Sequence, residues 1–257
     1  MSKKKYYDHL QAALKLHPIK DVVSIVGAGG KTSALIRLAK ELALIKKRVI
    51  VTTTTHLTQN SYDLIRYSGD LDHRLIENIE TRILDSPAVI AKRMVKGGQI
   101  KGISPEQVLK INREVTFDYM LVKADSSAQK SLKANNRYEP PVPLCTTLFL
   151  VIIGFDTIGK KINLKNVHRP QIVARILDKP LESHIQPSDI ITLLRHPLGL
   201  LKNRPPATRT AIILNKVGDH NMKEAVNLAE AIIKYGQGIN SVICGDIGRL
   251  HQLLLFT

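Results

Sequence analysis

The sequence predicts an α/β fold, a three-layer sandwich with helices on both faces of a mostly parallel sheet. Short β-branched and apolar runs alternate with segments of helical spacing along the 257 residues, which is the pattern of parallel strands joined by crossover helices. A glycine-rich turn joins the first buried run to the first long amphipathic segment. With 44% hydrophobic residues, the chain can bury the core of a single domain over residues 1–257.

The elements of the first half follow from apolar spacing and end signals. Residues 22–26 (Val-Val-Ser-Ile-Val) are apolar on both faces, as a buried strand should be. The segment 33–45 places Leu35, Leu38 and Leu42 at helical spacing, and the cations after it favour a helix C-terminus. The other predictions are a helix over 6–16, a strand over 49–51, a helix over 71–84, and two strands within 88–103 joined around Gly97 and Gly98.

The second half continues the alternation. Residues 104–107 (Ser-Pro-Glu-Gln) form a capping-box pattern with proline at the first helical position, which predicts a helix to about Val115. Residues 155–208 contain six prolines, and we interpret them as a helical insertion on the same core. The other predictions are strands over 119–124, 148–153 and 210–214, a proline-rich connector over 139–143, a helix over 221–235 and a final strand over 241–244.

The charge of the chain is unusual. Lys and Arg total 38 against 22 Asp and Glu, which gives a net charge of +16. This balance fits a nucleic-acid partner, an anionic phosphate ligand or a plain basic surface. Aromatic residues are only 4% of the chain, with no Trp. Proteins that bind single-stranded nucleic acid stack the bases on aromatic side chains, so a nucleic-acid partner is disfavoured.

Cysteine content and apolar run length bear on the compartment. The two cysteines, Cys145 and Cys244, form neither a disulfide framework nor a cysteine-rich zinc site, which fits a reducing cytoplasm. The longest apolar run, residues 148–155, is far shorter than the roughly 20 residues of a membrane span. No apolar stretch follows the basic N-terminus, as a signal peptide would require. We expect a cytoplasmic protein with no membrane partner.

The sharpest motif is a phosphate-binding loop between the first buried strand and its helix. Glycines let backbone N–H groups approach a phosphate, and the helix N-terminus adds the positive end of its dipole. Lys31 would reach the β- and γ-phosphates, and the Thr32 hydroxyl would ligate Mg²⁺. The loop is shorter than the usual P-loop, because only three residues separate its first glycine from the lysine. The predicted nucleotide-binding residues here are Gly27, Ala28, Gly29, Gly30, Lys31, Thr32 and Ser33.

A P-loop needs an acidic group near the metal, at the end of a neighbouring strand. Asp125 follows the strand over 119–124 and would hold Mg²⁺ directly or through water. Ser126 comes next in the chain. Thr54, Thr55 and His56 follow the second strand, at the sheet edge where ligands of parallel sheets bind. We therefore predict catalytic roles for Lys31 and Asp125, with the other four residues lining the site.

A base-recognition candidate follows the strand over 210–214. Residues 215–219 (Asn-Lys-Val-Gly-Asp) resemble the NKxD sequence with which GTPases recognise guanine, with one extra residue. Asn215, Lys216 and Asp219 are the predicted base contacts. Because of the extra residue, the sequence leaves ATP and GTP both open.

Several segments carry a family resemblance. They are 25–32 (Ile-Val-Gly-Ala-Gly-Gly-Lys-Thr), 51–56, 122–125 with 131–134, 139–140 with 142–143, 167–170 (Val-His-Arg-Pro) and 214–217. Together they resemble the YqeC family, whose members are described as selenium-dependent hydroxylase accessory or selenium-cofactor biosynthesis proteins. This sequence differs from the family pattern by Lys123 in place of an acidic residue, by Ser126 in place of glycine, and by the additional Gly218.

The resemblance implies a P-loop-like nucleotide-binding protein that assists the maturation of molybdenum hydroxylases carrying a selenium-containing cofactor. Its partner would be such a hydroxylase or another maturation protein. His168 and Arg169 would add cationic contacts to an anionic ligand.

The sequence therefore predicts an NTPase-like accessory protein that binds Mg²⁺ with ATP or GTP. It leaves open whether the nucleotide is hydrolysed, used in a transfer reaction or only bound. The alternatives are a non-catalytic scaffold with a degenerate P-loop and a basic nucleic-acid-binding protein.

Overall fold

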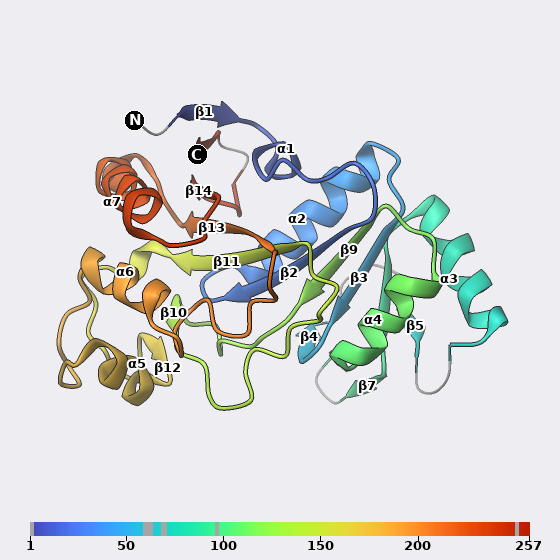
Figure 1. Ribbon diagram of the computed structural model, residues 1–257, viewed down its shortest axis with the longest axis horizontal. Coiled ribbons are helices and arrows are strands. Elements are labelled where there is room, and N and C mark those ends of the chain that lie inside the picture. Colours follow the sequence, from blue (N-terminus) through green and yellow to red (C-terminus); the bar gives the residue numbers. More distant parts are fainter. Residues whose placement is uncertain (1–2, 59–63, 68–70, 96–97, 250–251) are drawn as a thin grey trace.

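A computed structural model describes residues 3–58, 64–67, 71–95, 98–249 and 252–257. One large sheet organises the chain (Figure 1). From one edge to the other its strands are β1 (Lys4–Tyr7), β15 (Leu253–Phe256), β14 (Ser241–Cys244), β13 (Arg209–Asn215), β11 (Leu148–Gly154), β2 (Asp21–Gly27), β9 (Tyr119–Lys123), β3 (Val49–Thr53), β6 (Ala88–Ala91) and β5 (Leu64–Arg66).

The sheet is mixed but mostly parallel. Every pairing from β14 to β5 is parallel, and only β15 and β1 pair antiparallel. The central strands β2, β9 and β11 are buried along their whole length, as parallel strands covered on both faces should be. The predicted α/β class with a mostly parallel sheet is confirmed.

Helices cover both faces of this sheet, an arrangement compatible with a three-layer sandwich. On one face, α2 (Lys31–Leu44) buries Leu35, Leu38 and Leu42, and α1 (Leu10–Ala13) adds Leu10 to the same core. On the other face, a second core takes side chains from α3 (His73–Asp85), α4 (Pro105–Glu114), α5 (Pro170–Leu177), α6 (Pro187–Arg195) and α7 (Met222–Tyr235). The predicted capping box at Ser104 begins α4.

Two small sheets lie outside the main one. β4 (His56–Thr58), β8 (Gln99–Lys101) and β7 (Arg93–Val95) form an antiparallel sheet, and β10 (Leu132–Lys133) pairs in parallel with β12 (Val167–His168). The segment 155–208 contains the 3₁₀ turn η1 (Phe155–Thr157), β12, α5 and α6. A second 3₁₀ turn, η2 (Asp219–Asn221), precedes α7.

The structure corrects three predictions of secondary structure. The expected helix over 6–16 is replaced by strand β1 and the short helix α1. The expected final strand, β14, is followed by β15, and the region 88–103 holds three strands instead of two. Of the predicted turn, Gly97 lies outside the described residues. β1 and β15 pair with each other across nearly the whole chain, so local spacing gave no sign of either.

The glycine loop depends on close backbone approach at Gly27. This residue has a φ of +91°, and a Cβ there would fall on the carbonyl oxygen of Ile152. That oxygen already accepts a hydrogen bond from the Ala28 N–H at 2.7 Å. Only glycine therefore fits where β2 passes into the loop.

We predict that Gly27→Ala lowers the free energy of unfolding by about 3 kcal/mol, because left-handed strain adds to a clash with central backbone. Gly159→Ala is the matched control, since Gly159 has a φ of +77° with nothing near its Cβ position. It should cost only about 1 kcal/mol. Urea unfolding measures both, and equal losses would contradict the account.

Candidate functional site

The glycine loop lies at the centre of the sheet, between the end of β2 and the start of α2. Its outer residues border a pocket of about 740 Å³, which we call the glycine-loop pocket. Gly27 and Ala28 are buried beneath it. The predicted residues that line the pocket are Gly29, Gly30, Lys31, Thr32 and Ser33.

The other walls of the glycine-loop pocket come from neighbouring strand ends. Most follow the carboxyl ends of parallel strands, where ligands of such sheets bind. They are His56, Leu57 and Gln99 from the small sheet, Lys123 and residues 126–130 at and after β9, Asn215 and Lys216 at the end of β13, and Asp246 and Gly248 after β14.

The ammonium of Lys31 turns inward beneath the loop. It donates hydrogen bonds to the carbonyl oxygen of Gly27 and, over 2.8 Å, to the Ser127 hydroxyl. Asp125 Oδ1 lies 3.1 Å away. Burial lowers the pKa of the Lys31 ammonium, and Asp125 opposes that shift. Lys31 therefore lies at the pocket but is held on protein groups.

Asp125 is fully buried and surrounded by donors. Its Oδ2 accepts hydrogen bonds from the Gly27 N–H at 3.0 Å and from Lys133 Nζ at 2.9 Å. Its Oδ1 accepts no well-aligned hydrogen bond, although Lys31 is close. Asp125 thus joins the end of β9 to the start of the glycine loop.

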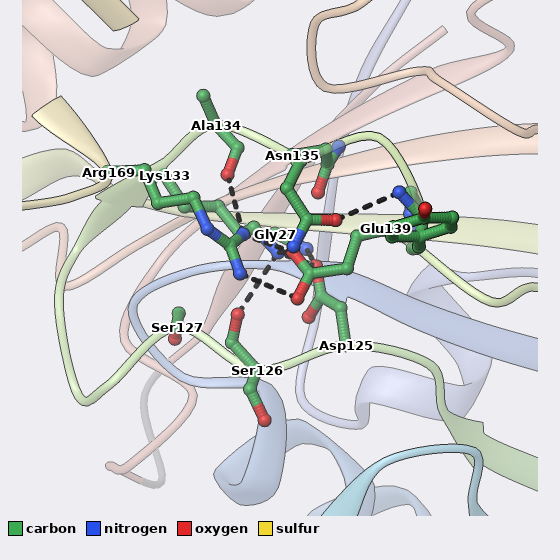
Figure 2. Close-up of polar contacts among 12 residues, drawn as sticks. Gly27, Asp125, Ser126, Ser127, Lys133, Ala134, Asn135, Glu139 and Arg169 are labelled. Carbon is green, nitrogen blue, oxygen red and sulfur yellow. Dashed lines mark hydrogen bonds and ion pairs between the residues drawn. The ribbon is translucent and has the colours of Figure 1, made fainter. Parts of the chain in front are cut away.

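Beyond Asp125, ion pairs continue to the 155–208 segment. Lys133 has no exposed surface, and its Nζ also donates to the Ser126 carbonyl oxygen at 3.0 Å and to Glu139 at 3.4 Å. Figure 2 shows the guanidinium of Arg169 facing the Glu139 carboxylate, and Arg169 Nη2 donates to Glu139 Oε1 at 2.8 Å. We call Lys31, Asp125, Lys133, Glu139 and Arg169 the ion-pair chain.

The order of charges in the ion-pair chain makes its burial tolerable. Each carboxylate lies between two cations, because buried charges need partners that replace lost hydration. Burial would raise the pKa of Glu139, but the contacts with Arg169 and Lys133 hold it below its usual value. The ion-pair chain links the glycine loop, the segment after β9 and the start of α5.

Lys123 differs from the other buried lysines. It is 8% exposed, it lines the pocket, and its Nζ donates to the His56 carbonyl oxygen. Among the described residues, no carboxylate forms an ion pair with it. Burial lowers the pKa of Lys123 to about 8, helped by Lys31 and Lys133 and opposed by Asp125.

The remaining predicted site residues divide into two groups. His56 and Ser126 line the pocket. Thr54 donates instead to the Pro141 carbonyl oxygen at 2.8 Å, and Thr55 contacts Thr53. Thr54, Thr55, His168 and Arg169 are not among its lining residues. Burial and the neighbouring Arg169 lower the pKa of half-buried His168.

The base-recognition candidate is only partly at the pocket. The Asn215 side chain donates to the Gly29 carbonyl oxygen at 2.6 Å and accepts from the Ile247 N–H at 2.8 Å. Lys216 also borders the pocket and donates to the Ser131 hydroxyl at 2.7 Å. Asp219 is exposed on η2, away from the lining residues. Asn215 therefore holds the glycine loop in place, whereas Asp219 does not line the pocket.

Sequence reasoning assigned no role to several residues that matter here. Lys133 and Glu139 fell within the quoted resemblance segments, but nothing in the pattern Leu-Lys-Ala showed that Lys133 is buried. Ser127, Lys130, Gln99 and Asp246 also border the pocket. Asp246 lies shortly after the end of β14. Its place after a parallel strand is the sequence signal that could have indicated a position at the pocket.

The pocket offers a limited set of ligands for Mg²⁺. Mg²⁺ keeps several waters and takes few protein ligands beside phosphate oxygens. The Thr32 hydroxyl, which borders the pocket, suits that role. Asp125 lies below, with Lys31 and Lys133 on its two oxygens. No cluster of three or more His, Cys, Asp or Glu side chains suited to a metal occurs among the described residues.

Comparison with known proteins identifies the family. The profile of the YqeC protein family matches residues 23–171, which include the glycine loop and the ion-pair chain. The chain belongs to the YqeC family. It is 33% identical over 233 residues to the Escherichia coli K12 protein described as the uncharacterized protein YqeC, covering 88% of this chain and 87% of that protein. In this YqeC-family chain, none of the helices within the described residues is long and apolar enough to cross a membrane.

We predict that Lys133→Met lowers the free energy of unfolding by about 3–5 kcal/mol, because it strips Asp125 and Glu139 of a buried partner. Lys160→Met is the control, since Lys160 pairs with Asp156 on the surface. That change should cost less than about 1 kcal/mol. Urea unfolding of both variants measures the difference, and a loss no larger than the control's would contradict a buried role.

Lys123→Met should change the free energy of unfolding in the opposite direction to Lys133→Met. We predict a rise of about 2 kcal/mol at pH 7, because the change removes a buried charge without an ion-pair partner. The pKa is about 8 in the folded state and about 10.4 when unfolded. Below pH 8 the buried charge lowers the free energy of unfolding of the wild type by its full amount. This loss disappears as the pH rises toward about 10.4, because the folded protein then releases the proton.

The stability gain of Lys123→Met over the wild type should therefore shrink as pH rises from 7 to about 10. Urea unfolding of both proteins at these two pH values measures it. A variant less stable than the wild type at pH 7, or a gain that grows with pH, would contradict the assignment.

Proposed function

We propose that the chain binds a magnesium nucleoside triphosphate, ATP or GTP, in the glycine-loop pocket. The single observation that carries this proposal is Lys31 at the N-terminus of α2, behind a positive-φ glycine loop and bordering a pocket of about 740 Å³. Loop N–H groups and the helix dipole favour phosphate at that place.

The charges around the pocket support an anionic ligand. Lys31, Lys130 and Lys216 border it, against one acidic residue, Asp246, in the described part of the lining. Such a one-sided set of charges attracts phosphates and raises their local concentration. The size of the pocket lies within the range of sites for ligands of this class.

The ion-pair chain gives Lys31 a way to change partners. When its ammonium turns to a phosphate, Asp125 keeps Lys133 and the Gly27 N–H. The carboxylate is then still paired, which avoids the cost of a lone buried charge. In this proposal Lys31 contacts the phosphates and Asp125 positions Lys31. Thr32 would hold Mg²⁺, and Asp125 would assist the metal through water.

We assign the nucleotide to a maturation step of selenium-dependent molybdenum hydroxylases in the cytoplasm. This part of the proposal is supported only by the resemblance of sequence segments to the described role of the family. The partner would be a molybdenum hydroxylase or a cofactor-maturation protein. Hydrolysis and NTP-dependent transfer both fit a site that positions phosphates with a few charges.

We predict that Lys31→Met weakens binding of Mg-ATP or Mg-GTP at least tenfold, because it removes the phosphate contact. Lys40→Met is the matched control, since Lys40 is an exposed lysine of the same helix. Its affinity should stay within about twofold of the wild type, as one exposed charge is screened by salt. Calorimetric titration at about 0.15 M salt measures all three proteins.

Failure of both nucleotides to bind the wild type, or equal affinities of wild type and Lys31→Met, would overturn the proposal. Binding without turnover would favour a scaffold with a degenerate loop. Retained binding of mixed DNA or RNA at about 200 mM salt would instead favour the nucleic-acid interpretation.

The maturation role has its own test in cells. Replacing the wild-type chain with Lys31→Met should lower the selenium content of the molybdenum hydroxylases of its host, because the nucleotide-dependent step fails. Lys40→Met should leave that content at the wild-type level. Elemental analysis of the purified hydroxylases measures it, and an unchanged selenium content with Lys31→Met would contradict the role.

A further inference from the structure

One buried cation of the glycine-loop pocket, Lys123, has no ion-pair partner among the described residues. Asp125 forms ion pairs with Lys31 and Lys133, and Lys216 forms one with Asp156. Lys123 is more than nine-tenths buried, and among the described residues its ammonium donates a hydrogen bond to the His56 carbonyl oxygen alone. A buried ammonium without a counter-charge is costly, and an anion in the pocket would offset that cost.

The pocket extends to both sides of the glycine loop. Asn215, Lys216, Asp246 and Gly248 lie on the side of β13 and β14, whereas Lys123, His56, Leu57 and Gln99 lie on the side of β9 and β3. Strand spacings of about 4.8 Å put the ends of β14 and β3 about 24 Å apart along the sheet edge.

A single nucleotide cannot fill both sides. Its phosphates lie at the loop, between the two, and its nucleoside extends to one side only. The β13 side contains the residues that follow the NKxD-like strand, so we place the nucleoside there. The glycine loop and the N-terminus of α2, which are the features that hold a phosphate tail, lie at the end of β2, between the two sides.

We propose that Lys123, with the backbone of His56 holding its ammonium in place, forms a subsite for the carboxylate or phosphate of a second, anionic substrate beside the bound nucleotide. This inference rests on the proposed nucleotide function and names the class of its co-substrate. Exposed His56 and Gln99 border the same subsite and supply further hydrogen-bonding groups. Lys130, from the loop after β9, adds positive charge at the pocket.

The test uses inorganic phosphate as the probe and three proteins: wild type, Lys123→Met and Lys40→Met. Each is first saturated with Mg²⁺ and a non-hydrolysable triphosphate analogue, and phosphate is then titrated by calorimetry. We expect one phosphate to bind the wild type and Lys40→Met. Lys123→Met should bind phosphate at least tenfold more weakly, while its affinity for the analogue changes less than threefold.

Two results would overturn the subsite. In one, phosphate does not bind the saturated wild type, or binds Lys123→Met equally well. In the other, Lys123→Met weakens the triphosphate analogue but not the corresponding diphosphate, which would make Lys123 a contact of the terminal phosphate.

Failure of the proposed nucleotide function would be seen separately, as no binding of the analogue to the wild type. Phosphate is then titrated into the nucleotide-free proteins. Tenfold weaker binding by Lys123→Met than by Lys40→Met would still support the subsite, and equal binding would overturn it.

Discussion

The site depends on one buried carboxylate. Asp125 holds the Gly27 N–H, Lys31 and Lys133 at once, and so fixes the start of the glycine loop, its lysine and the segment after β9 in one place. Its burial is possible only because cations surround it. Through Lys133 and Glu139 the same constraint reaches Arg169 at the start of α5, so the 155–208 segment is tied electrostatically to the loop.

This arrangement gives the two kinds of buried lysine different physical roles. Lys133 stabilises, because two carboxylates depend on it. Lys123 destabilises the free protein, because no described carboxylate forms an ion pair with it. Binding sites often keep such costly groups, since a ligand supplies the missing partner and the rest of the fold offsets the cost. The net charge of +16 is thus partly explained by lysines directed at one pocket, while most of it lies on the surface.

Much of the fold followed from local sequence. Buried strands such as 22–26, the capping box at 104–107 and the strand–loop–helix at 27–32 have signals within a few residues, and the structure forms each of them. β1 and β15 were missed because their pairing joins the two chain ends. At the site, Lys31 and Asp125 stood out by their places after strands. The roles of Lys133 and Glu139 come from ion pairs with Asp125 and with Arg169, which no local sequence pattern indicates.

The central claim is that a triphosphate occupies the glycine loop and takes Lys31 from Asp125. A crystal structure of the chain with Mg²⁺ and a non-hydrolysable ATP or GTP analogue tests it most directly. The account predicts phosphate oxygens on the N–H groups of residues 29–32, Lys31 Nζ on a phosphate, and Asp125 still bound to Lys133. A nucleotide bound elsewhere, with Lys31 remaining on Asp125 and the Gly27 carbonyl oxygen, would contradict it.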